Sequence, residues 1–461
     1  MKLPATHSFL SRSESHPRGS VLVIVLWISF GLVTLALYFA NSMTLELRGA
    51  DNRSAQLEAE HAIEGAARYA LFLLSNLEEP GQLPLLQTYQ REEVPVADAL
   101  FWFIGRGARE SGSTDPLYAL ADESSKLNLN TATVEMLEAL PMMTPELAAA
   151  IIDWRDENSD VTSGGAESES YLRLAPPYNC KNSKFETVEE LRLVLGANPD
   201  ILEGEDMNMN GVLDPNENDG NLSAPMDNSD GKLDAGILEY VTVFSRESNL
   251  RTNGSPRISL SQSGAQLQQQ LRTLLQEKFS AQRANQIAGQ LGGAQSVIRS
   301  PIEFFIRSRM TADEFAQIES DLTTTNGLIV EGKINVNTAS SAVLACIPGV
   351  GVEKAASMVS FRESNPGKLI SSAWVVEVLG QGSALQAGPH ITGRSSVFSA
   401  DIAAVGHHGR GFRRTWFVFD LTEGAPRVVY RQDLSQLGWP LGQHARQRMK
   451  ERATLLAGGA R

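Results

Sequence analysis

Residues 20–45 read SVLVIVLWISFGLVTLALYFANSMTL and contain no charged side chain. A run of about 20 apolar residues is long enough for an α-helix to cross the hydrocarbon core of a bilayer. Beyond this run, apolar residues recur at the spacing of one helix face as far as Leu74, so the helix is expected to continue as an amphipathic helix. The sequence therefore predicts one helix over 20–76, roughly 85 Å long at 1.5 Å per residue.

The leader in front of this run is polar, and its basic residues are Lys2, Arg12 and Arg18. Basic residues before a membrane segment favour a cytoplasmic N-terminus, which would place the bulk of the chain in the periplasm. Three interpretations are open: a secretory signal peptide cut after Ala40, an uncleaved anchor, or a leader cut after Gly19. The third resembles the type IV prepilin signal, which implies cleavage by prepilin peptidase between Gly19 and Ser20 and a retained membrane helix.

One position departs from that signal. Most proteins of the class carry a glutamate at the fifth mature position, where this chain has Ile24. The K-type minor pseudopilins of type II secretion lack this glutamate, and the chain resembles them here.

Length and charge restrict the function. The 461 residues are enough for two or more domains, and no second run of comparable apolar length appears, so a single-pass protein is expected. The formal net charge of −14 argues against a general polyanion binder. Cys180 and Cys346 are too few for a disulfide framework, and whether they pair is left open.

The chain contains an internal duplication. The stretch KLNLNTATVEMLEALPMMTPELAAAIIDWRDENSD begins at Lys126, and KINVNTASSAVLACIPGVGVEKAASMVSFRESNP begins at Lys333. Each copy predicts a helix, a tight turn and a second helix, and it resembles a helix-hairpin-helix module, which commonly binds nucleic acid phosphates through hairpin glycines. The first copy has Met142 and Met143 in its turn, and basic residues are few, which favours a packing role.

The segment 206–217, DMNMNGVLDPNE, has the spacing of an EF-hand loop. Alternate residues of such a loop point inward, glycine permits the turn, and oxygen atoms surround the cation. The predicted Ca²⁺ ligands are Asp206, Asn208, Asn210, the Val212 carbonyl, Asp214 and Glu217. Only three of them carry charge, so we expect modest affinity, with a dissociation constant on the order of 10⁻⁴–10⁻³ M.

Part of the EF-hand loop pattern recurs further along the chain, at Asn228, Asp230 and Asp234. Met226 and Ile237 occupy its first and last positions and cannot bind a cation, so Asp227 or Glu239 would have to substitute. Neither loop has clear flanking helices, which indicates structural sites. K-type pseudopilins bind calcium in this region, and the resemblance therefore implies Ca²⁺ here as well.

Residues 99–104 and three alternating runs between 396 and 432 predict strands, the last three forming a β-meander. His407 and His408 lie in a glycine-rich turn of this meander, where a solvated hairpin tip is favoured over a metal site. No catalytic motif of a hydrolase, metalloprotease or nucleotide-binding enzyme is present, so no enzymatic activity is predicted.

The predicted fold class is α+β: a pilin-like fold with a large inserted α-helical domain containing helix-hairpin-helix-like units. In it, the long N-terminal transmembrane and amphipathic helix packs on a small antiparallel sheet. The expected segments are a leader (1–19), that helix (20–76), the first part of the pilin-like domain (77–125), the inserted domain with the calcium loops (126–325), the second helix-hairpin-helix-like unit (326–390), the C-terminal meander (391–437) and a flexible tail (438–461).

The chain thus resembles the K-type minor pseudopilins of type II secretion over nearly every segment. The resemblance implies an inner-membrane protein at the tip of the pseudopilus that helps to initiate and cap assembly during protein export. Its implied partners are the minor pseudopilins I and J, other pseudopilins, the inner-membrane assembly platform and prepilin peptidase. The alternative is a membrane-anchored nucleic acid-binding or DNA-uptake protein, and a third possibility is a secreted calcium-stabilised protein.

Overall fold

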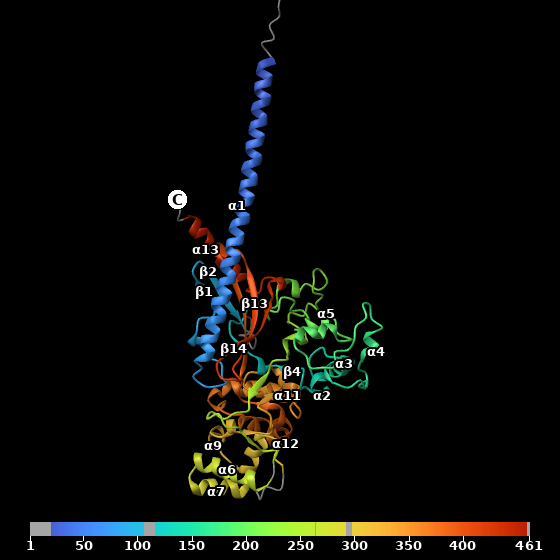
Figure 1. Ribbon diagram of the computed structural model, residues 1–461, viewed down its shortest axis with the longest axis vertical. Coiled ribbons are helices and arrows are strands. Elements are labelled where there is room, and N and C mark those ends of the chain that lie inside the picture. The colour runs from blue at the N-terminus through green and yellow to red at the C-terminus, as the bar shows by residue number, and fades with distance from the viewer. Residues whose placement is uncertain (1–19, 106–115, 263, 292–296, 459–461) are drawn as a thin grey trace, which may run out of the picture.

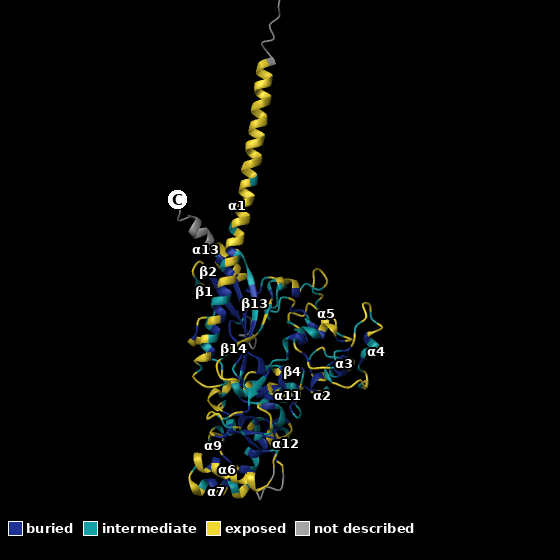
Figure 2. Cartoon of the chain, in the orientation of Figure 1, coloured by how far each residue is buried: buried dark blue, intermediate teal, exposed yellow. Residues whose placement is uncertain are grey.

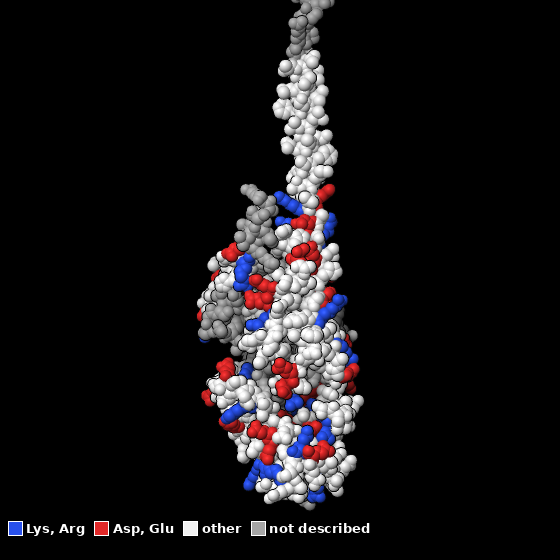
Figure 3. All heavy atoms as spheres, turned by 90° about the vertical axis from the view of Figure 1, so that its left-hand side faces the viewer, with Lys and Arg blue, Asp and Glu red and all other residues white. Residues whose placement is uncertain are grey.

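The computed structural model describes residues 20–105, 116–262, 264–291 and 297–458. One helix, α1 (Ser20–Ser75), projects far out of a folded head, as Figure 1 shows. Among the described helices, α1 alone is long and apolar enough to cross a membrane. Its projecting part is exposed along its length (Figure 2) and carries no charged side chain until it nears the head (Figure 3). The predicted helix over 20–76 is confirmed to within one residue.

The head contains a six-stranded antiparallel sheet with the order β1-β2-β12-β13-β14, in which β3 also pairs with β12. Its strands are β1 (Val94–Val96), β2 (Ala99–Ile104), β3 (Ala121–Asp122), β12 (Val397–Val405), β13 (Arg413–Asp420) and β14 (Arg427–Asp433). The strand predicted over 99–104 and the predicted meander are both confirmed. Because β2 and β3 precede the helical region and β12 follows it, that region is inserted into the sheet.

The soluble half of α1 covers one face of the sheet. Small residues of α1 let the helix approach closely, and Ile63, Ala66 and Ala70 are buried against Phe101 and Phe103 of β2. Since every residue of β2 is buried, the opposite face of the strand must also be covered.

A C-terminal helix, α13 (Gly442–Gly458), covers that second face. Leu441 and the helix residues Ala445 and Met449, spaced four apart, are buried in a cluster with Trp102 of β2. The prediction of a flexible tail over 438–461 is therefore wrong for the part that the structure describes. Its apolar residues form a stripe that the sheet needs as cover.

The part of the inserted region that follows residue 264 lies at the end of the head farthest from the membrane segment of α1, whereas the part up to residue 202 projects to one side (Figure 1). The helices of the whole region are α2 (Val134–Glu138), α3 (Pro145–Arg155), α4 (Ser168–Tyr171), α5 (Pro199–Leu202), α6 (Ala265–Lys278), α7 (Ala281–Gln290), α8 (Pro301–Ser308), α9 (Ala312–Ala316), α10 (Ser341–Ala345), α11 (Gly351–Ser364) and α12 (Trp374–Ala387). Its short strands are β4 (Leu127–Asn128), β5 (Val241–Thr242), β6 (Arg246–Ser248), β7 (Ile258–Ser259), β8 (Leu322–Thr323), β9 (Ile329–Glu331), β10 (Ile334–Asn335) and β11 (Ile391–Thr392).

The boundary predicted between 126–325 and 326–390 does not separate two packing units. One continuous core joins Leu137 and Ile151 of the first repeat copy to Leu344 and Met358 of the second. A separate core, around Leu274 and Phe315, holds α6, α7 and α9. Residues of the two copies thus belong to one continuous core.

The duplication is visible in identical contacts. In each copy an arginine at the end of the second helix donates to two backbone carbonyls near the first: Arg155 to Leu129 and Ala132, and Arg362 to Val336 and Ala339. Each copy also opens with a short strand in a parallel pair, β4 with β5 and β10 with β11. The turns correspond as well, since Met142 (φ 61°) adopts the left-handed backbone that Gly349 (φ 81°) has in the second copy.

Candidate functional site

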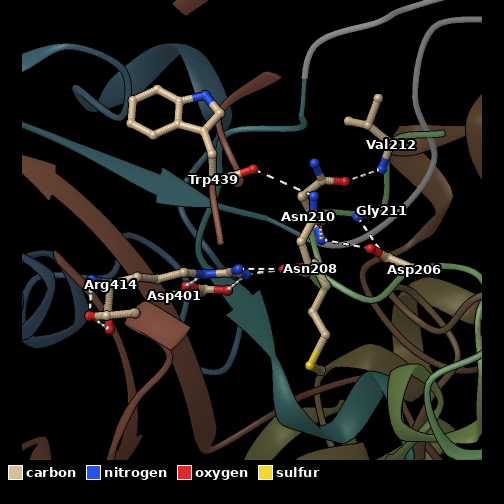
Figure 4. Close-up of polar contacts among 10 residues, drawn as sticks. Asp206, Asn208, Asn210, Gly211, Val212, Asp401, Arg414 and Trp439 are labelled. Carbon is tan, nitrogen blue, oxygen red and sulfur yellow. Dashed lines mark hydrogen bonds and ion pairs between the residues drawn. The ribbon is translucent and has the colours of Figure 1, made fainter. Parts of the chain in front are cut away.

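The first acidic loop, residues 206–217, is built around the carboxylate of Asp206. Its two oxygens accept hydrogen bonds from the backbone N–H groups of Asn210 (2.9 Å) and Gly211 (2.7 Å), as Figure 4 shows. Met209 (φ 50°) and Gly211 (φ 65°) both have left-handed backbone, which closes the tight turn predicted from the sequence.

The amide groups of this loop point at its carboxylates. Asn208 and Asn210 donate from their Nδ2 atoms to Oδ2 of Asp214 at 2.7 and 3.1 Å, and Oδ1 of Asn210 accepts from the N–H of Val212. The predicted ligands Asp206, Asn208, Asn210 and Asp214 are thus gathered in one place. The two amides supply the partial positive charge that this group of oxygens needs.

Glu217 is the buried acid of the loop. One carboxylate oxygen accepts from the N–H of Asp214 at 2.9 Å, and the other, Oε1, is buried with no hydrogen-bond partner among the described residues. Burial, together with the negative charges of Asp206 and Asp214, raises the pKa of Glu217 to about 8. A buried carboxylate oxygen without a partner, beside two more acids, suits a bound cation.

The side chains as they stand do not form a finished metal site. In the part of the chain that the structure describes, no three acidic, histidine or cysteine groups converge closely enough to hold a metal ion. To bind Ca²⁺, Asn208 and Asn210 would rotate their amides so that oxygen replaces nitrogen at the centre. The residue set therefore fits Ca²⁺ in its chemistry, after a local rearrangement of two amides.

The second loop brings together Asn228 and Asp234, whose side chains are joined at 3.1 Å. Sequence reasoning missed Glu205, whose carboxylate accepts from the N–H groups of Asn228 (3.3 Å) and Asp234 (3.0 Å). The exposed Asp230 accepts a local hydrogen bond from the backbone N–H of Lys232, and Asp227 accepts from the N–H groups of residues 219 and 220. Glu205 lies before the first loop in sequence, so the repeat pattern gave no sign of it.

A buried arginine ties the first loop to the sheet. Arg414 of β13 is fully buried, pairs with Asp401 of β12, and donates to the backbone carbonyls of Asn208 and Met209 (Figure 4). Asn208 also donates from its side chain to the carbonyl of Trp439 at 3.4 Å. The loop is therefore held by the sheet and by the segment that leads into α13.

The prediction of a solvated tip at His407 is wrong. His407, in the turn η9 (His407–Gly409), places Nδ1 2.7 Å from Glu58 and Nε2 2.9 Å from Asp51, both on α1. These hydrogen bonds, that of Glu58 first, raise the pKa of His407. The turn reaches α1 because Gly406 and Gly411 lie against the backbone of Ala55, where a Cβ atom would clash.

The second hairpin turn is occupied within the chain. Lys354, the basic residue nearest the second turn, donates to the carbonyl of Gly349 (3.2 Å) and to Ser383 (2.6 Å). A Cβ atom at Gly349 would lie 2.9 Å from Gln386, so α12 covers this turn. The geometry gives no support to phosphate binding there.

The remaining predicted positions are the prepilin cleavage site, Ile24 and the two cysteines. Gly19 lies outside the described residues, Ser20 begins α1, and Ile24 is an exposed residue in the apolar part of that helix. Cys180 and Cys346 are both buried and unpaired, so they do not form a disulfide with each other.

Comparisons with known proteins agree on one family. The chain is 28% identical over 192 residues to "Type II secretion system protein K" of Klebsiella pneumoniae, covering 39% of this chain and 58% of that protein. It is 28% identical over 194 residues to the protein of the same name from Aeromonas hydrophila, covering 39% and 59%. The alignments thus span about three fifths of these relatives.

A chain in the solved GspK-GspI-GspJ complex of the enterotoxigenic Escherichia coli type 2 secretion system has a TM-score of 0.40 and 12% identity, covering 84% of this chain and 99% of that one. Residues 116–204, which include the first repeat copy, match the family described as type II secretion system (T2SS), protein K. Residues 116–204 thus carry the domain of the type II secretion system protein K family, and the chain is similar to two curated proteins of that name.

Proposed function

We propose that this chain is a minor pseudopilin at the tip of the type II secretion pseudopilus, where it helps to initiate and cap assembly. The carrying observation is the position of the second part of the inserted region, with α6, α7, α9 and α12, at the end of the head opposite the membrane helix (Figure 1). Pilin-class subunits assemble by packing their N-terminal helices with the heads outward. A large body above the head leaves no room for a further subunit to stack on it.

The membrane helix supports the same proposal. With Ile24 in place of a glutamate, the uncharged run 20–45 of α1 offers no carboxylate to pair with the N-terminus of a subunit ahead of it. Such a subunit is suited to the first position of a fibre. In this proposal prepilin peptidase cuts after Gly19, α1 crosses the inner membrane once with its N-terminus in the cytoplasm, and the head lies in the periplasm.

The proposed partners are the minor pseudopilins I and J, with which the chain forms a tip complex, and then other pseudopilins and the assembly platform. The nucleic acid alternative has no comparable support, because α12 covers the second repeat turn and the first turn has Met142 and Met143 in place of glycines. The role is structural, and no residue is assigned to catalysis.

We also propose that the acidic loops bind Ca²⁺ in the periplasm. The first site would use Asp206, Asn208, Asn210, the Val212 carbonyl, Asp214 and Glu217, and the second would add Glu205 to Asn228, Asp230 and Asp234. A bound Ca²⁺ supplies positive charge that neutralises neighbouring carboxylates and cross-links the loop. Since Arg414 already ties the first loop to the sheet, the ion would fix the insertion relative to the pilin-like part.

The test of the tip role uses the full chain in cells. An epitope on the exposed α6 and a second one on a major pseudopilin are located by immunogold electron microscopy on overproduced pseudopili. The proposal expects the α6 label at one end of each fibre, and the chain to co-purify from membranes with I and J. Label spread along the fibre, or purification without I and J, contradicts it.

The mature N-terminus is a separate test. Mass spectrometry of the chain from cells with prepilin peptidase should give Ser20 as the first residue, and from cells without it the intact leader. A chain beginning at Asn41 in both strains would instead show a conventional signal peptide.

A further inference from the structure

A cleft lies between the pilin-like part of the head and the inserted region. The end of α1, the residues just after it and the turn that follows β13 line one side, and β6 and the residues after it line the other. The volume of the cleft is about 590 Å³. Ligand-binding clefts usually have volumes of roughly 300–1,000 Å³, so this one is large enough for a short segment of a bound chain.

Leucine side chains from both parts line this cleft. Leu74 and Leu77 lie at and just after the end of α1, Leu421 follows β13, and Leu250 follows β6. Leu250 is 39% exposed. Serine and threonine residues line the cleft between them. A lining that mixes leucines with polar groups suits a polypeptide, whose backbone needs hydrogen-bond partners, better than a bare hydrocarbon chain.

Arg394 is a cation of this cleft with unused hydrogen-bonding capacity. It is half-buried between β11 and β12, and it lines both the cleft and a smaller recess of about 50 Å³. The recess adjoins the cleft, because both are also lined by Glu247, Arg257 and Ser320. The guanidinium of Arg394 forms no hydrogen bond or ion pair with any residue that the structure describes. Since arginine has only donors, these N–H groups are available to an anion.

Arg257 adds a second donor at the same place. Its Nη1 atom lies 3.3 Å from Oε1 of Glu247, and its Nε atom is buried without an acceptor among the described residues. A buried donor without an acceptor is unfavourable, and a bound oxygen atom would remove that cost. Two guanidinium groups with unused donors therefore lie beside one pair of adjoining cavities.

The carboxylates that line these cavities have other partners. Glu247 is paired with Arg257, and Glu423 is paired with Arg427 at 2.9 Å. Glu319 accepts from a backbone N–H at 3.1 Å, and the charge of Arg394 acts on it without an ion pair. A carboxylate that enters the cleft thus meets a guanidinium that no described carboxylate contacts.

We propose that this cleft binds a polypeptide segment of another protein, one that combines apolar side chains with a carboxylate. The leucines would contact the apolar side chains, and Arg394 would bind the carboxylate through two parallel N–H···O hydrogen bonds. Because the two sides of the cleft belong to the pilin-like part and to the insertion, the bound segment would also hold these parts together. The inference depends on neither the tip position nor Ca²⁺, so its failure would leave the proposed function standing.

The experiment uses the full chain in phosphatidylcholine nanodiscs and two peptides with the same fluorescent label at the N-terminus. Their sequences are Leu-Ser-Leu-Glu-Leu and Leu-Ser-Leu-Gln-Leu, both with an amidated C-terminus. Fluorescence polarisation, corrected for empty nanodiscs, gives the two dissociation constants. We expect the glutamate peptide to bind about tenfold more tightly, because only its carboxylate forms charge-assisted hydrogen bonds with Arg394.

Two variants separate the two halves of the site. Arg394→Gln should weaken the glutamate peptide to the affinity of the glutamine peptide, and Leu250→Gln should weaken both peptides equally. The matched control is Arg173→Gln, which removes an exposed arginine just after α4, in the part of the insertion that projects to one side (Figure 1). It should change neither dissociation constant. Thermal unfolding midpoints equal to that of the wild type show that the variants are folded.

Three results overturn the proposal: equal affinity for the two peptides, no binding of either peptide below about 1 mM, or a preference for glutamate that persists in Arg394→Gln. Dodecanoate is tested as a carboxylate on a hydrocarbon chain. If dodecanoate binds and neither peptide does, the cleft belongs to a free amphiphile and not to a polypeptide, which also overturns the proposal.

Discussion

The guanidinium of Arg414 and the carboxylate of Asp401 form a two-point ion pair inside the head, with Nε–Oδ1 at 2.9 Å and Nη2–Oδ2 at 2.6 Å. The pair joins the central strand β12 to β13, and the same guanidinium donates to the carbonyls of Asn208 and Met209. One buried cation thus connects the pilin-like sheet to the acidic loop of the insertion. This buried ion pair stabilises the head only if every N–H donor of the guanidinium has an acceptor.

Replacing Asp401 by alanine should lower the free energy of unfolding by about 3–5 kcal/mol, because Arg414 would keep its charge without a paired carboxylate. Urea unfolding of the full chain in detergent, followed by near-ultraviolet circular dichroism, measures this loss. As a control, Lys368→Ala breaks the exposed pair with Glu377 and should cost less than about 1 kcal/mol. An equally small loss for Asp401→Ala would show that the buried pair does not support the fold.

The turn of the first repeat offers a stabilising change. Met142 has φ 61°, a left-handed conformation that costs a residue with a side chain about 1–2 kcal/mol, and Met142→Gly should raise the free energy of unfolding by about 0.5–1 kcal/mol. The reciprocal change, Gly349→Ala, should destabilise, because its Cβ would lie 2.9 Å from Gln386 Oε1 and 3.1 Å from the Ser383 carbonyl. Thermal unfolding midpoints of both variants test this pair, and a loss on Met142→Gly would mean that the methionine side chain contributes packing.

The parts of the fold that the sequence predicts are those with a local pattern. The uncharged run predicts α1, the alternation of apolar and polar residues predicts the meander, and the repeated sequence reveals the duplication. The helix α13 has no such strong pattern, since Leu441, Ala445 and Met449 are few and are surrounded by charge. A signal was nevertheless present in β2, because six consecutive apolar residues without alternation require cover on both faces of the strand.

The candidate site was likewise predictable only where its residues are close together in the sequence. The ligands of the first loop lie within 12 residues, so their spacing alone predicts that they converge. Arg414 and Asp401 are about 200 residues away, and only the fold brings them to the loop. His407 was misread for the same reason, because Asp51 and Glu58, which bind it, belong to a helix at the other end of the chain.

The contact of His407 with α1 predicts a pH dependence. Hydrogen bonds to Glu58 and Asp51 raise the pKa of His407 above its ordinary value of about 6.5, and Arg410 is the other charged group at this contact. A raised pKa contributes stability that is complete below the unfolded value and is lost as the pH rises through the folded value. The unfolding midpoint should therefore fall as the pH is raised from about 6.5 upward.

His407→Gln should remove this part of the pH dependence, measured as the difference between variant and wild-type unfolding midpoints at each pH. His408→Gln is the matched control, because His408 is the exposed neighbour in the same turn and should leave the dependence unchanged. If the unfolding midpoints of the wild type and of His407→Gln change with pH in parallel, the imidazole makes no contact that depends on its charge.

Calcium binding to the first loop gives the final prediction. At 10 mM Ca²⁺ and a dissociation constant on the order of 10⁻⁴–10⁻³ M, the wild-type chain should gain about 1.4–2.7 kcal/mol of stability. Glu217→Gln should lose most of this gain. Without Ca²⁺ the same variant should be more stable than the wild type, because the buried, unpartnered carboxylate oxygen is replaced by a neutral amide. Glu423→Gln, at an exposed turn, is the control and should respond to Ca²⁺ as the wild type does. A cation ligand should therefore show two opposite effects of Glu217→Gln on stability, a gain without Ca²⁺ and a loss with Ca²⁺. If the variant is instead less stable than the wild type without Ca²⁺ and is still stabilised by adding Ca²⁺, Glu217 is not a ligand of the site.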